Sequence, residues 1–136
     1  YNFINRAEFE KKIKRGVFLE YNNYNDQYYG VEKEVLTGTL DKYDLVFTNI
    51  DVNGKASLDK NNIQHLAIFL LPDSLAVLKK RIRRRGGMSE AALEKRMTIA
   101  RAEIKSAKAY DYRVVNKDGK IDETVAELVK IIKHET

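Results

Sequence analysis

Three short apolar runs alternate with helical patterns along this chain, and this alternation limits its fold more than any other feature. The runs lie at residues 45–51, 66–71 and 113–116. Strands that alternate with helices form parallel βαβ units, in which ligands bind at the carboxyl ends of the strands. The sequence therefore predicts an α/β fold, with a parallel sheet, helices on both faces and a site at one edge of the sheet.

Helix-capping residues mark where the helices begin. Asn5 with Glu8 forms a capping-box pattern for a helix that ends at Gly16. Ser89 opens the longest helix, and an amphipathic helix from residue 121 to about 133 closes the chain. Other expected elements are a helix capped by Asp73 or Ser74, a strand at 17–21 and a hairpin turn at Asn25-Asp26. A short helix is expected from 31 to about 40, broken or ended near Gly38. We therefore expect the first 35 residues to form a small α+β lobe that precedes the sheet in the chain.

Composition excludes several classes of protein. The 136 residues contain no cysteine, so disulfides and thiolate metal sites are ruled out and a reducing, cytoplasmic location is expected. With only two histidines, a His-based zinc site is not expected. The longest apolar run is far too short to span a bilayer. We therefore expect no membrane partner, whereas the sequence does not determine the oligomeric state.

The positive charge is concentrated in one segment. The net charge is +5, and residues 79–85 hold six cations and no acid, so the rest of the chain is close to neutral. Such a site suits a compact polyanion better than a long duplex, and we expect no nucleic-acid partner. A nuclear-localisation or RNA-binding run remains an alternative, as does a solvated helix end whose cations lie near the helix C-terminus.

Three groups of side chains are candidates for chemistry. The basic segment, the pair Gly86-Gly87 and the next helix with Arg96 would make a hinged cationic flap that stabilises phosphoryl charge and excludes water. Glu20, among many tyrosines, could accept two hydrogen bonds from the edge of guanine, although aromatic residues on strands are also ordinary core. Asp51 follows the first apolar run, where it could reach Mg²⁺ or simply cap a turn.

Seven motifs, found in the same order in one known family, cover essentially the whole chain. They are Tyr1-Asn2-Phe3; Gly16-Val17-Phe18-Leu19-Glu20-Tyr21; Tyr28-Tyr29-Gly30; Ile50-Asp51 with Gly54; Ile68-Phe69-Leu70-Leu71-Pro72-Asp73-Ser74; Arg81 with Arg85-Gly86 and Arg96; and Tyr110-Asp111-Tyr112 with Val114-Val115-Asn116. Together they resemble the guanylate kinases. The resemblance implies a P-loop-kinase-like α/β core, a small GMP-binding lobe and a helical lid, divided here as 1–34 (lobe), 35–80 (core), 81–101 (lid) and 102–136 (core).

The resemblance implies roles for five residues in GMP binding. Tyr1 and Tyr29 would hold the GMP phosphate, with backbone amides near Gly30. Glu20 would accept hydrogen bonds from guanine, and Asp51 would organise the site near GMP and the metal. The family's reaction moves the γ-phosphoryl group of ATP to GMP, giving GDP and ADP in purine metabolism, with Mg²⁺ as the cofactor bound to the nucleotide rather than to a protein metal site.

The resemblance also implies an ATP side of the site. Arg85 and Arg96 would be the catalytic residues that close over the transferring phosphoryl group. Arg81, Arg85 and Asn116 would bind ATP, with Asn116 near the adenine. The family's G-x-x-G-x-G-K-[ST] loop is not in this sequence, so these residues alone are not expected to form a competent kinase, and the enzyme prediction is conditional on that loop in the full protein.

Two departures from the family pattern concern the substrate pocket. Val31 stands where the family usually has Ser or Thr, a hydroxyl expected to help bind guanine. Asn49 replaces the first Asp of the D-I-D motif and removes a negative charge beside the presumed metal. Two alternatives therefore stay open. One is a non-catalytic guanylate-kinase-like module that binds protein or phosphopeptide, and the other is a kinase for another monophosphate.

Overall fold

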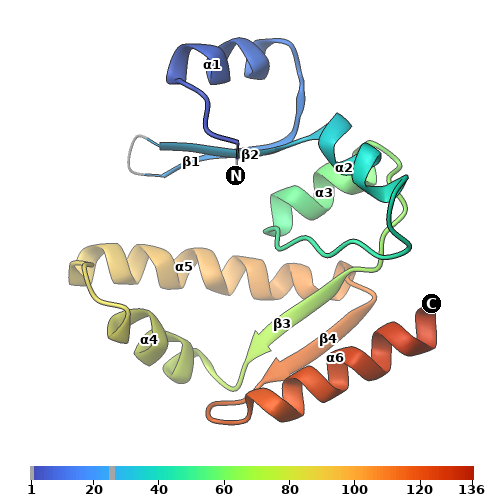
Figure 1. The fold of residues 1–136 in the computed structure, drawn as a ribbon. Helices are drawn as coiled ribbons and strands as arrows, with labels where there is room; N and C mark the ends of the chain where they lie inside the picture. The colour runs from blue at the N-terminus through green and yellow to red at the C-terminus, as the bar shows by residue number, and fades with distance from the viewer. Residues whose placement is uncertain (1, 25–26) are drawn as a thin grey trace. The chain divides into compact units, whose positions relative to one another are not determined.

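The structure is a computed structural model that describes residues 2–24 and 27–136. It divides into two compact units, Tyr1–His65 and Leu66–Thr136, called here the N-terminal and C-terminal units (Figure 1). Tyr1 and the predicted turn at Asn25-Asp26 lie outside the described residues. No helix among the described residues is long and apolar enough to cross a membrane.

The N-terminal unit is built on an antiparallel hairpin with three helices. The hairpin pairs β1 (Phe18–Tyr24) with β2 (Gln27–Glu32). The helices are α1 (Arg6–Lys14), α2 (Lys33–Leu40) and α3 (Val52–Lys60). Leu19, Leu36 and Leu58 form the buried core of this unit. The unit has the predicted α+β character, although it extends beyond the predicted lobe at 1–34. The expected helix at 31–40 starts at Lys33 because Val31 and Glu32 still belong to β2, and it continues through Gly38 to Leu40 without the predicted break.

Helix α1 forms as its capping pattern predicts. The Asn5 side chain accepts a hydrogen bond from the Glu8 amide, at 2.9 Å. At the other end, Gly16 has a φ of 65°, a left-handed conformation that favours glycine. The cap and the glycine together fix where the chain enters β1.

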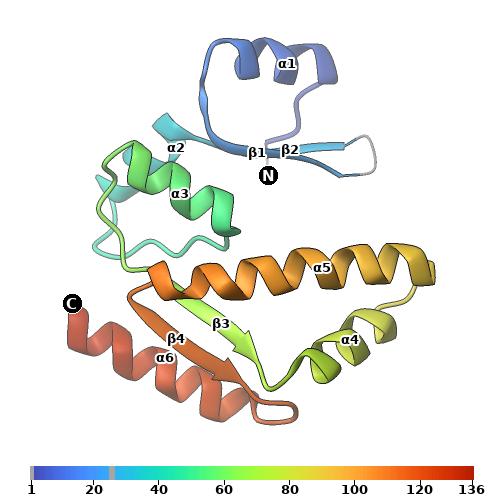
Figure 2. The same ribbon diagram turned by 180° about the vertical axis from the view of Figure 1, so that it is seen from behind.

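The C-terminal unit contains a parallel strand pair with helices around it. Its elements are β3 (Ile68–Pro72), α4 (Leu75–Arg84), α5 (Glu90–Ser106), the 3₁₀ turn Ala107–Ala109, β4 (Tyr112–Asn116) and α6 (Ile121–Glu135). Strands β3 and β4 are parallel, with Leu70 opposite Val114. Helix α6 runs along β4, and α5 lies on the other side of the strand pair (Figure 2). This arrangement confirms the predicted α/β fold with a parallel pair.

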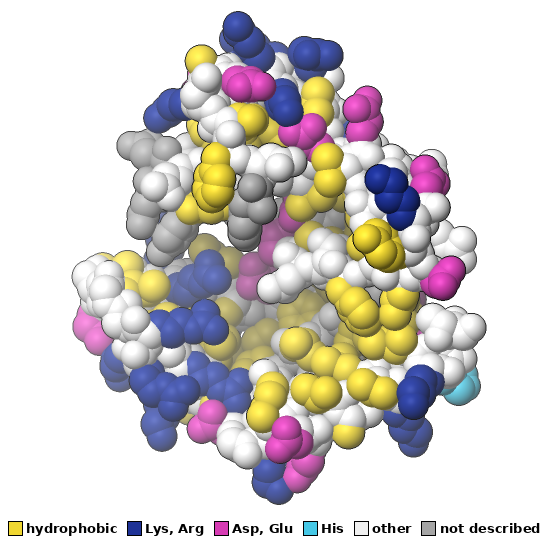
Figure 3. Space-filling view, viewed as in Figure 1, with side chains coloured by type: hydrophobic (Ala, Val, Ile, Leu, Met, Phe, Trp, Pro, Cys, Tyr) yellow, Lys and Arg dark blue, Asp and Glu magenta, His cyan; other side chains and the backbone are white. Residues whose placement is uncertain are grey.

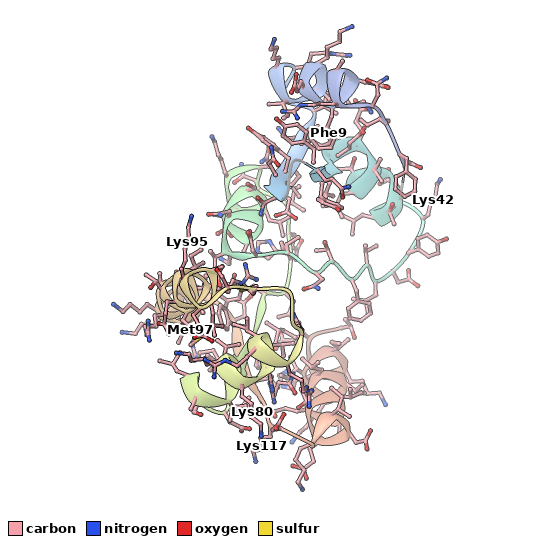
Figure 4. The ribbon with its side chains drawn as sticks, turned by 90° about the vertical axis from the view of Figure 1, so that its left-hand side faces the viewer. Phe9, Lys42, Lys80, Lys95, Met97 and Lys117 are labelled. Carbon is pink, nitrogen blue, oxygen red and sulfur yellow. The ribbon has the colours of Figure 1, made fainter. Side chains whose placement is uncertain are left out.

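Side chains from the last recognised motif hold the strand pair together. Asp111 accepts a hydrogen bond from the Ala67 amide at 2.7 Å, and the Tyr110 ring meets Phe69 edge-on. Val114 is fully buried in β4, and Met97 is buried on α5 (Figure 4). The Tyr110-Asp111-Tyr112 motif therefore has a structural role in this unit, joining the start of β4 to β3.

The strand predicted at residues 45–51 is wrong. This segment has no regular structure and pairs with neither described sheet, and the side chains of Leu45 and Phe47 are 45% and 74% exposed. A strand needs a hydrogen-bonding partner along at least one edge, which an apolar run cannot supply by itself. The turn that Asp51 was expected to cap is instead the first turn of α3, a helix that was not predicted from the sequence.

Candidate functional site

One face of the hairpin is filled by an aromatic stack under α1. The Phe9 ring stacks between Phe18 and Tyr28, with ring centroids 4.2 and 5.0 Å away (Figure 4). The Arg6 guanidinium lies over the Tyr28 ring, 5.5 Å from its centroid. Of the candidate tyrosines, Tyr28 is therefore a packing residue, as aromatic residues on strands commonly are.

Gly30 belongs to this packed face. A Cβ atom there would lie 2.9 Å from both the Glu20 carbonyl oxygen and Phe18 Cδ1, and 3.1 Å from Phe9 Cζ. Only a residue without a side chain fits under the stack without displacing these neighbours. The close approach gives Gly30 a packing role, while its predicted contribution to phosphate binding stays a prediction.

The opposite face of the hairpin carries the predicted substrate residues. Glu20 pairs with Val31 across the strands, and Tyr29 pairs with Asn22. On β2, Tyr29 and Val31 alternate with Tyr28 and therefore lie on the face opposite the stack. A register shift between Phe18 and Glu20 puts Glu20 on the face of its partner Val31, although Phe18 belongs to the stack. Tyr29 is 46% exposed, and its hydroxyl donates a hydrogen bond to Gln27 Oε1 at 2.7 Å. The structure thus brings two of the predicted GMP ligands, Glu20 and Tyr29, together.

Glu20 extends from β1 to the first turn of α3. Its Oε2 atom lies only 2.0 Å from the place where a Cβ atom of Gly54 would be. Burial of the Glu20 carboxyl, and then the negative charge of Asp51, raise the pKa of this group above its ordinary value. The site therefore holds a partly desolvated carboxyl beside a second one, and shifts of this kind are common at functional sites.

Asp51 is the N-cap of α3. Its Oδ1 atom accepts hydrogen bonds from the amides of Asn53 at 2.9 Å and Gly54 at 3.0 Å. Asp51 therefore caps a helix, as the capping alternative predicted. The cap also places its negative charge close enough to raise the pKa of Glu20. Asn49 lies exposed in the irregular segment before this cap.

In the C-terminal unit, the structure brings Arg81 and Asn116 together. Arg81 Nη2 donates to the Asn116 carbonyl at 3.0 Å, and Nε donates to Asp118 Oδ1 at 3.2 Å. The Asp118 amide in turn donates to Asp73 Oδ2 at 2.7 Å. Arg81 therefore ties α4 to the carboxyl end of β4. Sequence reasoning missed the part of Asp118, for which the only signal was its position before Gly119, where a turn is expected.

Arg85 and Arg96 are exposed on two consecutive helices. Arg85 is the C-cap of α4, and Gly86 and Gly87 follow with φ values of 72° and 73°, which confirms the predicted glycine break between α4 and α5. Arg96 lies on α5 and is exposed. The closure of both arginines over a phosphoryl group stays a prediction.

Other cations of the basic segment line a groove along α4. The groove is lined by Ala76, Lys79, Lys80, Arg83 and Arg84, and Lys and Arg side chains gather over this helix in Figure 3. Lys79 pairs with Glu94 and Arg83 pairs with Glu90, both on α5. Part of the positive charge therefore joins α4 to α5.

The described residues contain no group of three His, Cys, Asp or Glu side chains placed to hold a metal ion. Glu20 and Asp51 are only two carboxylates, and Asp51 already caps α3. Mg²⁺ commonly keeps several waters and is bound through substrate phosphates together with one or two carboxylates. One or two carboxylates are enough for a metal that arrives with a nucleotide, and a contact of Glu20 or Asp51 with such a metal stays a prediction.

Comparison with known proteins assigns the family. A family model described as guanylate kinase matches residues 1–135. The chain belongs to the guanylate kinase family. It is 38% identical over 132 residues to the guanylate kinase of Rickettsia felis, covering 97% of this chain and 68% of that protein. It is 37% identical over 133 residues to that of Prochlorococcus marinus, covering 98% and 71%.

A solved structure supports the same assignment. The crystal structure of guanylate kinase from Anaplasma phagocytophilum matches with a TM-score of 0.73 and 28% identity, covering 99% of this chain and 64% of that one. The chain thus spans between 64% and 71% of the length of these relatives. The resemblance found from the seven motifs and the kinase-type α/β fold are both confirmed.

Proposed function

We propose that a protein carrying this sequence transfers the γ-phosphoryl group of Mg-ATP to GMP, giving GDP and ADP. The observation that supports this most is the Glu20 carboxyl, held at α3 on the same hairpin face as Tyr29 and Val31. The guanylate kinase family membership supplies the reaction class. Part of the relatives' length is not covered by this chain, and a phosphate-binding loop for ATP is expected in that part.

Glu20 suits the recognition of guanine. An ionised carboxylate has two acceptor oxygens, and guanine offers the N1–H and N2–H donors side by side. Adenine presents no such pair of donors. With adenine bound, the carboxylate would lack hydrogen-bond donors, and this loss selects for guanine. Partial burial lowers the exposure of the carboxylate to water and strengthens each hydrogen bond to it.

Tyr29 and Tyr1 would hold the phosphate of GMP. The exposed Tyr29 hydroxyl donates its proton in a hydrogen bond to Gln27 Oε1, and by rotating it can donate to a phosphate oxygen instead. Val31, the cross-strand neighbour of Glu20, offers no hydroxyl to the base. A lost hydrogen bond of this type costs about 0.5–1.5 kcal/mol, which lowers guanine affinity without abolishing it.

The cationic helices would act on the transferring group. Arg85 follows α4 immediately before two glycines with left-handed backbone, a position from which a small rotation moves its guanidinium. Arg96 would join it from α5, and their forked N–H groups would stabilise negative charge on the phosphoryl oxygens. Arg81 would position the ATP side by holding the Asn116 backbone. Mg²⁺, bound with ATP, would neutralise phosphate charge.

A coupled assay of ADP release tests the proposal. Mg-ATP is supplied with GMP, dGMP, AMP, UMP or CMP, and we expect turnover with the guanine nucleotides only. Glu20→Ala should raise the KM for GMP strongly, whereas Glu34→Ala, an exposed glutamate of α2, should behave like the wild type. Turnover with no monophosphate would contradict the kinase proposal and favour a non-catalytic module of the same family. The cytoplasmic location expected from the sequence stays a prediction.

A further inference from the structure

We propose that Gly54 positions the Glu20 carboxylate for hydrogen bonding to guanine and so contributes to substrate specificity. Because Gly54 has no side chain, it leaves the space that this carboxylate occupies. The inference rests on the proposed function and adds a residue to it. Gly54 lies in the first turn of α3 and is buried, far from Glu20 in the sequence but in contact with it in the fold.

The space at Gly54 is occupied by the Glu20 side chain. A Cβ atom at position 54 would lie 2.0 Å from Glu20 Oε2, 2.8 Å from its Cδ and 2.7 Å from Ile50 Cβ. Non-bonded carbon atoms in proteins sit about 3.5–4.0 Å apart, so these distances cannot coexist with a methyl group. An alanine at 54 would therefore displace the Glu20 carboxylate, the neighbour that stands closest.

Backbone conformation does not explain this glycine. The glycines with positive φ are Gly16, Gly86, Gly87 and Gly119 among the described residues, and Gly54 is not one of them. Alanine is the better helix former, so helix propensity gives no reason for a glycine at 54. The requirement for glycine at 54 comes from the contact with Glu20 and Ile50.

The N-terminus of α3 does not bond the carboxylate in place of guanine. The Asn53 and Gly54 amides, which would be the natural donors, already bond to Asp51 Oδ1. Glu20 is instead kept in position by packing against Gly54 and by its strand pairing with Val31. Its acceptor oxygens are therefore preorganised for a ligand, and preorganised acceptors give specificity without a rearrangement on binding.

The first test compares Gly54→Ala with Gly38→Ala. Gly38 is also in a helix, α2, but a Cβ atom there meets nothing within 4 Å, so it is the matched control. We expect Gly54→Ala to raise the KM for GMP about tenfold or more while the weaker binding of AMP stays unchanged. Gly38→Ala should keep the wild-type preference. A Gly54→Ala protein with the wild-type preference for GMP over AMP would overturn the proposal.

A double-mutant cycle separates a specific role from a general loss of structure. If Gly54 acts through Glu20, Gly54→Ala should have little further effect on GMP affinity in a Glu20→Ala background. An equal loss in both backgrounds would mean that position 54 acts through Ile50 or α3 instead, and would overturn the proposal. Should Gly54→Ala not fold, Glu20→Asp serves in its place, because it withdraws the carboxylate by one methylene without a clash, and unchanged GMP selectivity would then count against the inference.

The two proposals fail in different ways. If the wild type neither binds nor phosphorylates GMP, the proposed function and this specificity role both fall, while the coupling of positions 20 and 54 in unfolding midpoints still reports their contact. If the wild type uses GMP and Gly54→Ala uses it equally well, the proposed function stands and only this inference fails.

Discussion

Asp51 combines a capping role with an electrostatic one, and two substitutions separate them. Its Oδ1 atom accepts two amide hydrogen bonds at the start of α3, and its charge helps raise the pKa of Glu20. Asp51→Ala removes both the cap and the charge. Asp51→Asn removes the charge but keeps a side-chain oxygen, and Asn caps helices about as well as Asp.

The magnitudes follow from these contacts. Loss of an N-cap costs about 1 kcal/mol of unfolding free energy, within a range of about 0.5–2. The charge at a helix N-terminus contributes about 0.3–1 kcal/mol, and relief of the repulsion with Glu20 offsets part of that. We therefore expect Asp51→Ala to lose about 1 kcal/mol and Asp51→Asn to lose only a few tenths.

Urea unfolding followed by far-UV circular dichroism measures the difference. With a slope of about 2 kcal/mol per molar urea, Asp51→Ala should move the midpoint down by about 0.5 M and Asp51→Asn should move it much less. Asn49→Ala, in the exposed irregular segment, is the control and should leave the midpoint in place. Equal midpoint shifts for the alanine and asparagine variants at position 51 would refute the capping explanation.

Three further predictions come from other contacts. Phe9→Ala should destabilise the N-terminal unit by about 3–5 kcal/mol in urea unfolding because it empties the centre of the aromatic stack, and Phe9→Leu should cost clearly less. Arg81→Met should lower the unfolding free energy by about 1–2 kcal/mol, since it removes the hydrogen bond to the Asn116 carbonyl and the ion pair with Asp118; an unchanged midpoint would show that the tie adds no stability. Glu20→Gln should be more stable than the wild type at neutral pH, because a pKa raised in the folded state means that ionisation of Glu20 destabilises the fold. This gain in stability should vanish below the ordinary glutamate pKa of 4.5. A gain that does not change with pH in unfolding titrations would contradict this.

Local chemistry made much of the fold predictable. The caps at Asn5, Ser74 and Ser89 could be predicted from the sequence because each side chain accepts a hydrogen bond from the amide three residues further along the chain. The parallel pair β3–β4 followed from alternating strands and helices. Glu20 and Tyr29 could be assigned to one site from the family motifs, and the hairpin register does place them on one face.

Features that depend on distant partners were not predictable in this way. The apolar run at 45–51 looked like a strand, but strand formation depends on a neighbouring edge, and the described residues give it none. The contact between Glu20 and Gly54 joins two elements whose approach is set by tertiary packing. The hydrogen bonds from Arg81 to Asp118 and from Asp118 to Asp73 likewise join three separate segments of the chain. None of these leaves a periodic signal in the sequence.

Calorimetric titration of the wild-type protein with GMP and with IMP measures whether the Glu20 carboxylate accepts hydrogen bonds from the guanine edge. IMP keeps the N1–H donor but lacks the 2-amino group, so one hydrogen bond to a charged acceptor is lost, worth about 1.5–3 kcal/mol. We expect IMP to bind roughly 10–150-fold more weakly than GMP. Equal affinity for GMP and IMP would contradict this.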